Sequence, residues 1–196
     1  ADVEVIACAD QVIKELNIQK SSKLNINSLG NIDDRKKYIK DLTDYLKNYK
    51  NKLSKDSLIR LEKNPLRILD SKTEDDISII KNAPKLNEYL NNSSRESFKL
   101  VLEGLNNLNI KYVINENLVR GLDYYNDTTF EFITDKLGSQ SAIIAGGRYD
   151  GLMKQMGGSD IPGIGWAGGI ERLILLSTIK MMKNKHISII PVGEEN

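Results

Sequence analysis

The sequence predicts an α+β fold in which a helical insertion interrupts an antiparallel β-sheet core. Three observations support this prediction. Segments with the alternation or the β-branched and aromatic content of strands lie near the start of the chain and in its last third. Between them, the stretch from Asn31 to about Asn107 has apolar residues at helical spacing and contains no glycine before Gly104. The strand-like segments of the last third follow one another closely, which favours antiparallel pairing.

The first thirty residues are expected to form one helix and one strand. Apolar residues recur at helical spacing from Asp2 to Leu16, which predicts a helix with one buried face. Leu24 and Ile26 alternate with polar neighbours, which predicts a half-buried strand from Lys23 to Asn27. The residues of Asn27-Ser28-Leu29-Gly30 are typical of a turn.

Helices are expected throughout the insertion. Asp33 or Asp34 could cap a helix that contains Tyr38 and Leu46, and Ser54 could cap the next helix. The further predicted helices are Lys55–Lys63, which Asn64-Pro65 ends, Glu74–Asn82, Lys85–Leu90 and Ser94–Leu108.

The last third is expected to return to strands. The predicted strands are Tyr112–Ile114, Thr129–Ile133 and Ala142–Ile144. A helix with an apolar face is expected from Gly169 to Met182, and the segment Ile187–Val192 is expected to begin another strand.

The composition excludes several classes of protein. Of the 196 residues 40% are hydrophobic and 28% charged, and the net charge of +1 gives no overall field that points to nucleic acid. Cys8 is the single cysteine, which excludes an internal disulfide and fits a reducing compartment. The sequence contains no recognisable signal peptide and no apolar run long enough to cross a membrane. We therefore expect a cytoplasmic protein, with an organellar location as the alternative.

The segment Leu118-Val119-Arg120-Gly121-Leu122-Asp123-Tyr124-Tyr125 combines charged and aromatic residues in one short window. It is too polar for a buried strand and too aromatic for a solvated loop, so we interpret it as the lining of a pocket. Arg120 offers five donors in a planar fork and could hold a phosphate and a carboxylate together while they react. The alternative is a structural ion pair between Arg120 and Asp123 or Glu116.

Two glycine-rich segments follow, Ala145-Gly146-Gly147-Arg148-Tyr149-Asp150-Gly151-Leu152 and Gly163-Ile164-Gly165-Trp166-Ala167-Gly168-Gly169-Ile170-Glu171-Arg172-Leu173. Gly146, Gly147 and Gly151 permit tight turns and the close approach of a ligand, although a glycine turn between strands would look similar. Gly163-Ile164-Gly165 is not interpreted as a phosphate loop, because it lacks the Lys-Ser/Thr pair of a P-loop and no βαβ unit surrounds it.

Together, these three segments resemble the catalytic domain of histidyl-tRNA synthetase, a class II aminoacyl-tRNA synthetase, and the resemblance extends from the first residues to about Leu176. It implies a catalytic core of class II type that activates L-histidine with ATP to histidyl-adenylate and transfers the histidyl group to tRNA(His). It also implies a homodimer in the full-length protein and Mg²⁺ that accompanies ATP. No metal site built by the protein is expected.

The resemblance assigns roles to five residues. Arg120 is the expected catalytic residue, which contacts the carboxylate of histidine and the α-phosphate of ATP. Tyr125 and Tyr149 are expected to line the histidine pocket, because a phenol can donate to or accept from an imidazole nitrogen. Gly169 and Arg172 match motif 3, so both are expected to bind ATP, and Arg172 is expected to contact its γ-phosphate.

The neighbours of these residues are expected to have secondary roles. Tyr124 and Tyr125 should point in opposite directions, as on a strand, so Tyr124 belongs to the core or stands behind the pocket. Tyr149 has the alternative of a packing aromatic with an exposed hydroxyl. Glu131 is expected to stand behind the residues that touch the substrate.

The helical insertion carries a further resemblance. Asn64-Pro65-Leu66-Arg67-Ile68-Leu69-Asp70-Ser71-Lys72 resembles the family's insertion domain, which lies near the tRNA acceptor stem. Between Asp33 and Lys63 there are ten Lys or Arg residues and six acids. Contacts to phosphates and a solvated helix surface both explain these basic residues.

The expected domains are a core segment at residues 1–30, the helical insertion at 31–108, the core with Arg120 and motif 3 at 109–183, and the start of a linker to an anticodon-binding domain at 184–196. Ala1 is not a methionine and the first helix is already under way, so a fragment without motifs 1 and 2 is expected. On its own it should not complete adenylation.

Two other functions stay open. The regulatory subunit of ATP phosphoribosyltransferase shares the fold of the synthetase and binds histidine without charging tRNA. Arg120 in its intact segment, Arg172 and the segment Asn64–Lys72 favour the synthetase. The other possibility is a helical interaction module on a degenerate core, which predicts no ATP site.

Overall fold

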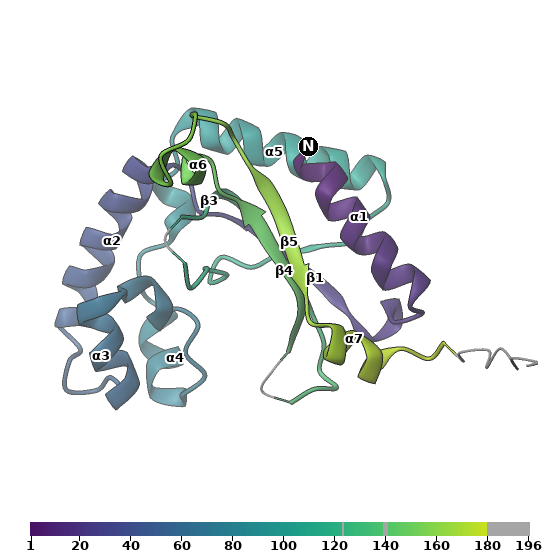
Figure 1. Ribbon diagram of the computed structural model, residues 1–196. Helices are drawn as coiled ribbons and strands as arrows, with labels where there is room; N and C mark the ends of the chain where they lie inside the picture. The colour runs from purple at the N-terminus through teal and green to yellow at the C-terminus, as the bar shows by residue number, and fades with distance from the viewer. Residues whose placement is uncertain (123, 139–140, 180–196) are drawn as a thin grey trace, which may run out of the picture.

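A five-stranded sheet forms the centre of the molecule in the computed structural model, which describes residues 1–122, 124–138 and 141–179 (Figure 1). The strand order is β2-β1-β3-β4-β5. The strands are β1 (Lys23–Ser28), β2 (Val113–Ile114), β3 (Asn126–Ile133), β4 (Ala142–Arg148) and β5 (Ile164–Gly168).

Antiparallel pairing joins β1, β3, β4 and β5, as predicted for the segments Thr129–Ile133 and Ala142–Ile144. The prediction is wrong for β2, which pairs in parallel with β1 and aligns Asn25 with Val113. Between these strands the chain passes through the insertion and then through helix α5 (Asn92–Asn107). A crossover of this length can return the chain in its original direction, which a short turn cannot do.

Apart from the short helix Leu152–Gln155, which was not predicted, the helices lie close to the predicted segments. Besides α5 they are α1 (Asp2–Glu15), α2 (Ile32–Lys47), α3 (Lys55–Lys63), α4 (Glu74–Ile80), α6 (Leu152–Gln155) and α7 (Ile170–Leu176). The predicted helix Lys85–Leu90 is a single 3₁₀ turn at Leu86–Glu88. Pro84 and the next helix cap, Asn91, leave too few residues between them for a stable α-helix.

The end of the chain departs from the prediction. Helix α7 stops at Leu176 instead of Met182, because Ser177 already has an extended backbone. The predicted strand Ile187–Val192, the linker at 184–196 and His186 lie outside the described residues. None of the helices in the described part of the chain is long and apolar enough to cross a membrane.

Side-chain caps begin two helices of the insertion. Ser54 caps α3 as predicted, since its hydroxyl accepts a hydrogen bond from the Ser57 N–H. The prediction for α2 is wrong: Asn31 is the cap, and its side chain accepts from the backbone N–H groups of Asp33 and Asp34. The Asp34 carboxylate is engaged elsewhere, because it accepts from the Asn91 N–H at 3.0 Å.

The apolar residues form two separate cores. The first lies between the sheet and helices α1 and α5, and it includes Ile6, Ile13, Leu24, Ile26, Val101, Leu105, Phe130 and Phe132. The second fills a lobe of α2, α3 and α4 that stands to one side of the sheet in Figure 1, and it includes Tyr38, Leu42, Leu46, Leu61, Ile68 and Ile79. Because α5 packs with the sheet, we propose that the helical insertion ends near Asn91 and not at residue 108.

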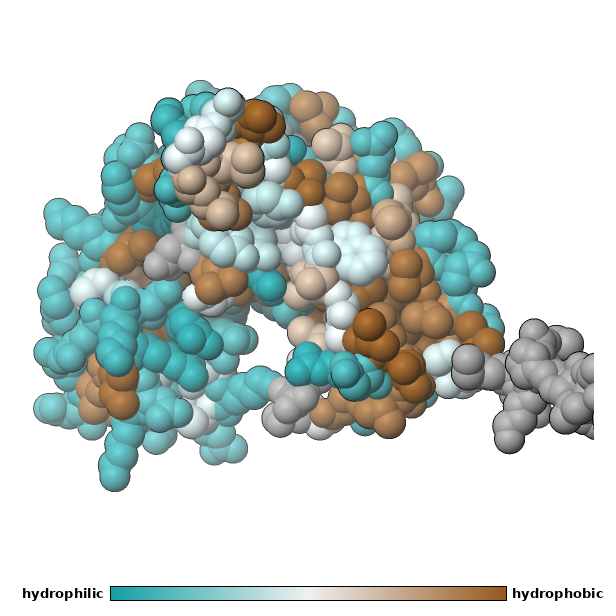
Figure 2. All heavy atoms as spheres, in the orientation of Figure 1, coloured by the Kyte–Doolittle hydropathy of each residue, from teal (hydrophilic) through white to brown (hydrophobic). Residues whose placement is uncertain are grey.

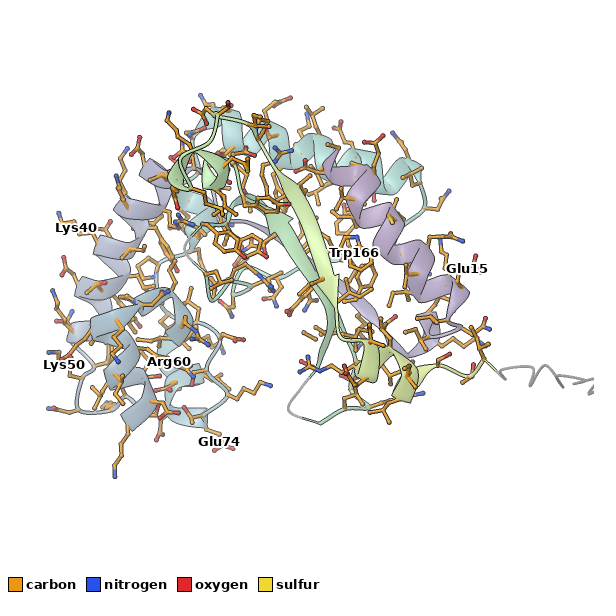
Figure 3. The ribbon with its side chains drawn as sticks, in the orientation of Figure 1. Glu15, Lys40, Lys50, Arg60, Glu74 and Trp166 are labelled. Carbon is orange, nitrogen blue, oxygen red and sulfur yellow. The ribbon has the colours of Figure 1, made fainter. Side chains whose placement is uncertain are left out.

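The register gives the sheet two chemically different faces. Leu24, Ile26, Phe130, Phe132 and Ile144 belong to the first core, and Trp166 of β5 packs on this core from the same side as α1 (Figure 3). The alternate positions, which point away from that core, carry small or polar residues: Asn25, Asn27, Thr129, Glu131, Ala145, Gly147, Gly165 and Ala167. We call these positions the polar face of the sheet.

Candidate active site

The Arg120 segment crosses the polar face of the sheet at the side of the lobe. The side-chain amide of Asn27 in β1 donates hydrogen bonds to the carbonyl oxygens of Leu118, at 3.1 Å, and Glu116, at 3.3 Å. Asn27 and Leu118 are both buried. The chain just before Arg120 is therefore fixed to the sheet.

Arg120 has a donor that no described residue satisfies. Its Nε is buried and has no hydrogen-bond partner in the described part of the chain. Its guanidinium carbon lies 5.2 Å from the centre of the Tyr125 ring, within the range of a cation–π contact. Since buried polar groups nearly always have partners, such a donor is available to a ligand.

The structure addresses one of the two ion pairs considered for Arg120. Glu116 instead binds the insertion side of the molecule, through Lys85 at 3.6 Å and the Asn87 side chain at 2.7 Å. The other candidate, Asp123, lies outside the described residues.

Three tyrosines form a cluster beside Arg120. The ring centres of Tyr124 and Tyr125 are 4.6 Å apart, and the Tyr149 ring stands nearly perpendicular to both, at 6.2 and 6.3 Å. A hydrogen bond with Tyr125 is the largest of the effects that raise the pKa of the Tyr124 hydroxyl. The prediction that Tyr124 and Tyr125 point in opposite directions is wrong, because both precede β3 and do not follow strand alternation.

Glycines make room for two of these rings. A Cβ on Gly147 would lie 3.0 Å from Cδ1 of Tyr125, and a Cβ on Gly165 would lie 3.0 Å from the Tyr149 hydroxyl. Gly146 and Gly147, which were expected to permit a tight turn or the close approach of a ligand, both lie within β4. Gly151 has the positive φ of 84° that a turn glycine adopts. Gly147 and Gly165 therefore let the tyrosine rings lie close to the backbone of the strands.

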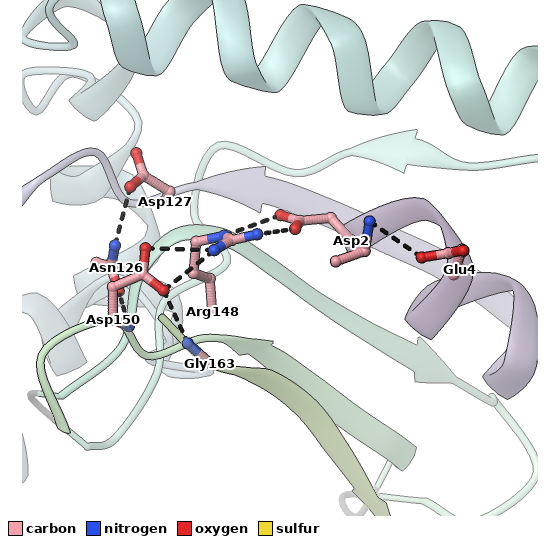
Figure 4. Close-up of polar contacts among 8 residues, drawn as sticks. Asp2, Glu4, Asn126, Asp127, Arg148, Asp150 and Gly163 are labelled. Carbon is pink, nitrogen blue, oxygen red and sulfur yellow. Dashed lines mark hydrogen bonds and ion pairs between the residues drawn. The ribbon is translucent and has the colours of Figure 1, made fainter. Parts of the chain in front are cut away.

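An ionic network includes Arg148 and Asp150, the residues directly before and after Tyr149 (Figure 4). The Arg148 guanidinium binds the Asp2 carboxylate at the start of α1, with Nε to Oδ2 at 3.2 Å, and the Asp150 carboxylate, with Nη1 to Oδ1 at 3.0 Å. Asp150 also accepts from the Gly163 N–H at 3.0 Å. Burial alone would raise the pKa of Asp2, but hydrogen bonds with Arg148 and Thr128 lower it.

The network was missed by the sequence interpretation. Asp2 and Arg148 are 146 positions apart in the sequence, so no local pattern connects them. A weaker signal was present, because Arg148 and Asp150 are two opposite charges among glycines, directly beside Tyr149. Charged residues in such a segment need partners.

Glu131, on the polar face, lies within electrostatic range of charged residues of the insertion. Burial raises the pKa of its carboxyl; the charge of Arg120 opposes this effect and the charge of Asp70 adds to it. A hydrogen bond from Asn25 and the charge of Lys72 also lower the pKa of Glu131. Residues of the segment Asn64–Lys72 therefore lie close enough to affect the middle of the sheet.

Arg172 and Gly169 lie at the opposite end of strands β4 and β5 from the tyrosines. The Arg172 guanidinium donates to the carbonyl oxygen of Ala142, the first residue of β4, at 2.6 Å, whereas Tyr149 directly follows the last residue of that strand. A strand of this length spans about 20 Å. The structure therefore brings Arg120, Tyr125 and Tyr149 together and leaves Arg172 at a distance along the sheet.

The molecule is concave beside the lobe. Figure 2 shows the concavity between the lobe of α2–α4 and the lower end of the sheet, with pale, weakly polar residues above it. No group of three or more His, Cys, Asp or Glu side chains suited to a metal ion occurs among the residues that the structure describes.

Comparison with known proteins agrees with this arrangement. The profile of the histidyl-tRNA synthetase family matches residues 2–173. The chain belongs to the histidyl-tRNA synthetase family. The match covers the Arg120 segment, both glycine-rich segments and the insertion, so the predicted family and the α+β fold are confirmed.

Relatives within the histidyl-tRNA synthetase family are similar over the whole chain. Histidine–tRNA ligase of Ehrlichia ruminantium (strain Welgevonden) is 50% identical over 195 residues, which are 100% of this chain and 47% of that protein. Histidine–tRNA ligase of Rickettsia rickettsii (strain Iowa) is 48% identical over 196 residues, with the same coverage. The chain spans about half the length of the curated relatives it matches.

Solved structures show the same fold. Apo histidyl-tRNA synthetase of S. aureus has a TM-score of 0.67 at 33% identity, over 89% of this chain and 42% of that one. A Bacillus halodurans protein described as an ATP phosphoribosyltransferase regulatory subunit/histidyl-tRNA synthetase has a TM-score of 0.58 at 19% identity, over 90% and 49%, which is a likeness of fold alone. Relatives near 50% identity are named as ligases, so the regulatory-subunit alternative is less supported.

Proposed function

We propose that the chain is part of a histidine–tRNA ligase and that it supplies residues that hold L-histidine and the reacting phosphate. In the proposed reaction a carboxylate oxygen of histidine attacks the α-phosphorus of ATP, and the bond to the β-phosphate breaks to release pyrophosphate. The resulting histidyl-adenylate then transfers its histidyl group to the 3′ end of tRNA(His), and AMP leaves. Family membership and the ligase names of the relatives support this proposal.

The observation that carries the proposal is the unpartnered, buried Nε of Arg120 beside the tyrosine cluster. In the proposed role the guanidinium contacts both the histidine carboxylate and the α-phosphate, so that the two reacting groups are held together. A fixed cation near the phosphate stabilises the charge that develops during the attack, and one such contact contributes roughly 3 kcal/mol.

Tyr125 and Tyr149 are proposed to bind the imidazole ring of histidine. Their rings stand nearly perpendicular at 6.3 Å, beside Gly147 and Gly165, which leaves two phenol groups near one small-residue surface. A phenol can donate to one imidazole nitrogen or accept from the other, which suits a neutral ring. Tyr124, whose ring contacts both of the others, is proposed to support them.

The remaining contacts are proposals from the family. Gly169 and Arg172 are proposed to bind ATP near its outer phosphates, with Mg²⁺ as a companion of the nucleotide. An extended nucleotide along the polar face would account for their distance from the tyrosines. The basic residues of the lobe are proposed to contact tRNA; Lys40 and Lys50 point outward from it (Figure 3). A cytoplasmic homodimer is proposed for the complete protein.

The test is histidine-dependent ATP–pyrophosphate exchange, measured on the full-length protein that contains this chain. Exchange with histidine and with no other amino acid is expected. Arg120→Ala should lower its rate about 10²- to 10³-fold. The rate of Arg120→Lys should lie between those of wild type and Arg120→Ala, because lysine keeps the charge and lacks the planar fork of donors. The exposed Lys99→Ala on α5 is the control and should exchange normally.

The exchange assay, combined with measurements of histidine and ATP binding on the same protein, separates the alternatives. A folded protein that binds histidine and gives no exchange would favour a histidine sensor of the regulatory-subunit kind. A folded protein that binds neither histidine nor ATP would favour an interaction module on a degenerate core.

A further inference from the structure

Arg35 connects the lobe to the candidate histidine site. It lies near the start of α2, where Asn31 caps the helix, and its side chain is half-buried. Its Nη1 donates a hydrogen bond to the backbone carbonyl oxygen of Tyr125. We propose that Arg35 is a positioning residue that sets the place of the Tyr125 ring relative to Tyr149. This inference rests on the proposed function, which gives Tyr125 the imidazole of histidine.

Apolar packing joins the same two parts of the molecule. Val119 and Tyr125 pack against the core of the lobe, although they belong to the segment that crosses the sheet. Gly121 lies beside Arg67 of the lobe, where a Cβ would be 3.7 Å from the guanidinium carbon. On its other side Tyr125 meets Gly147 of β4. The Arg120 segment is thus held between the lobe and the sheet.

The base of the lobe is fixed close to Tyr125. Asp127, two residues after the tyrosine, accepts from the Leu29 N–H at 2.7 Å and donates its own N–H to Gly30 at 2.9 Å. Its carboxylate accepts from the Ser94 hydroxyl at 2.8 Å. The chain enters the lobe after Gly30 and has left it by Ser94. Asp127 therefore binds the chain at both ends of the lobe, close to the tyrosines. Arg35 adds a contact from within the lobe itself.

The chemistry of this contact explains why it would affect binding more than reaction. A guanidinium that binds a carbonyl oxygen restricts the backbone at Tyr125, and the ring position depends on that backbone. Loss of the contact would let the ring move, whereas Arg120 keeps its charge at the reacting phosphate. Weaker binding of the ground state and transition state alike appears as a higher KM for histidine with little change in kcat.

The experiment compares three variants of the full-length protein in ATP–pyrophosphate exchange. Arg35→Met removes the donor and keeps a long side chain. Arg35→Lys keeps the charge and an N–H donor group and loses the planar fork. Lys99→Met is the matched control, an exposed basic residue on α5, outside the lobe. Thermal unfolding of every variant is measured in parallel.

Arg35→Met is expected to raise the KM for histidine about tenfold, a change of about 1.4 kcal/mol, with kcat and the KM for ATP within about twofold of wild type. Arg35→Lys should recover most of the loss, and Lys99→Met should match wild type. A normal KM for histidine in Arg35→Met would overturn the inference, as would an equal loss in all parameters with a lower melting temperature. Absence of histidine-dependent exchange in the wild type would instead refute the proposed function, and the inference with it.

Discussion

The ring of Tyr149 lies directly against the backbone of Gly163. A Cβ on Gly163 would be 2.4 Å from Cε2 of the ring, a distance that real atoms do not adopt. The same tyrosine is tied to Gly163 by a backbone hydrogen bond of 2.8 Å from its N–H to the glycine carbonyl oxygen. The position of this ring therefore depends on the absence of a side chain on Gly163, the residue just before β5.

Gly163→Ala is expected to displace the Tyr149 ring and to raise the KM for histidine about tenfold in ATP–pyrophosphate exchange. The added methyl must push the ring away, because its three nearest neighbours would all be atoms of the Tyr149 ring. Ser159→Ala, in the exposed part of the same loop, is the control. An unchanged KM would show that Tyr149 does not bind histidine.

Substitution of Asp150 provides a second test of the role of Tyr149 in histidine binding. Asp150→Ala removes the acceptor of the Gly163 N–H and one partner of Arg148, so we expect a loss of stability of about 2 kcal/mol and a higher KM for histidine. Asp150→Asn keeps an acceptor oxygen and should show a smaller effect. Asp160→Ala, an exposed partner of Lys154, should change neither urea unfolding nor exchange. An Asp150→Ala protein with normal KM would contradict this role of the network.

Local interactions are the part of this structure that could be predicted from sequence. Ser54 was identified as a cap because a cap depends on the few residues that follow it. Asn31 was missed because Asn31, Asp33 and Asp34 are all good caps, and the choice depends on where Asp34 binds. Arg120, Tyr125 and Tyr149 were brought together in the prediction by the resemblance, and the structure brings them together in space.

Long-range packing is the part that could not be predicted. The apolar stripe of α5, with Val101 and Leu105, indicates a buried helix but does not say whether the lobe or the sheet buries it. The parallel pairing of Val113 with Asn25 depends on the route of the 87 residues between them. Arg35 and Tyr125 are 90 positions apart, and nothing in the sequence links a helix arginine to that carbonyl oxygen.

The buried carboxylate of Asp76 is expected to stabilise the lobe. It accepts hydrogen bonds from the hydroxyls of Ser54, Ser57, Ser71 and Thr73, at 2.6 to 2.7 Å, and from the Ser54 N–H at 2.9 Å. Asp76→Ala should lower the free energy of unfolding by about 3 kcal/mol in urea titrations, because these donors lose their shared acceptor. Asp75→Ala is the control, since it removes an exposed carboxylate from the same helix turn. Equal losses in both variants would contradict the role of the network.

The contribution of Asp76 should depend on pH in a defined direction. Burial alone would raise its pKa, but the hydrogen bonds from Ser57, Ser71, Thr73 and Ser54 hold the pKa well below its usual range. A carboxyl whose pKa is lowered in the folded state stabilises fully above its unfolded pKa of about 4 and loses this effect as the pH falls below that value. The stability difference between wild type and Asp76→Ala should therefore shrink from pH 6 to about pH 3. A constant difference over this range would show that the charge is not the source of the stabilisation.

The close approach of α1 and α5 gives a prediction about the first core. A Cβ on Gly104 of α5 would be 2.6 Å from Cγ2 of Val3 in α1, so Gly104→Ala should cost about 1–3 kcal/mol of stability by overpacking. In an exposed helix the same change would stabilise by up to about 1 kcal/mol, because alanine is the better helix former. Val3→Ala in the same protein should remove the clash, so that the double variant is more stable than the sum of the single changes predicts. Additive effects in urea unfolding would mean that the two helices do not touch at this point, and α5 would then not be held to the sheet layer through α1.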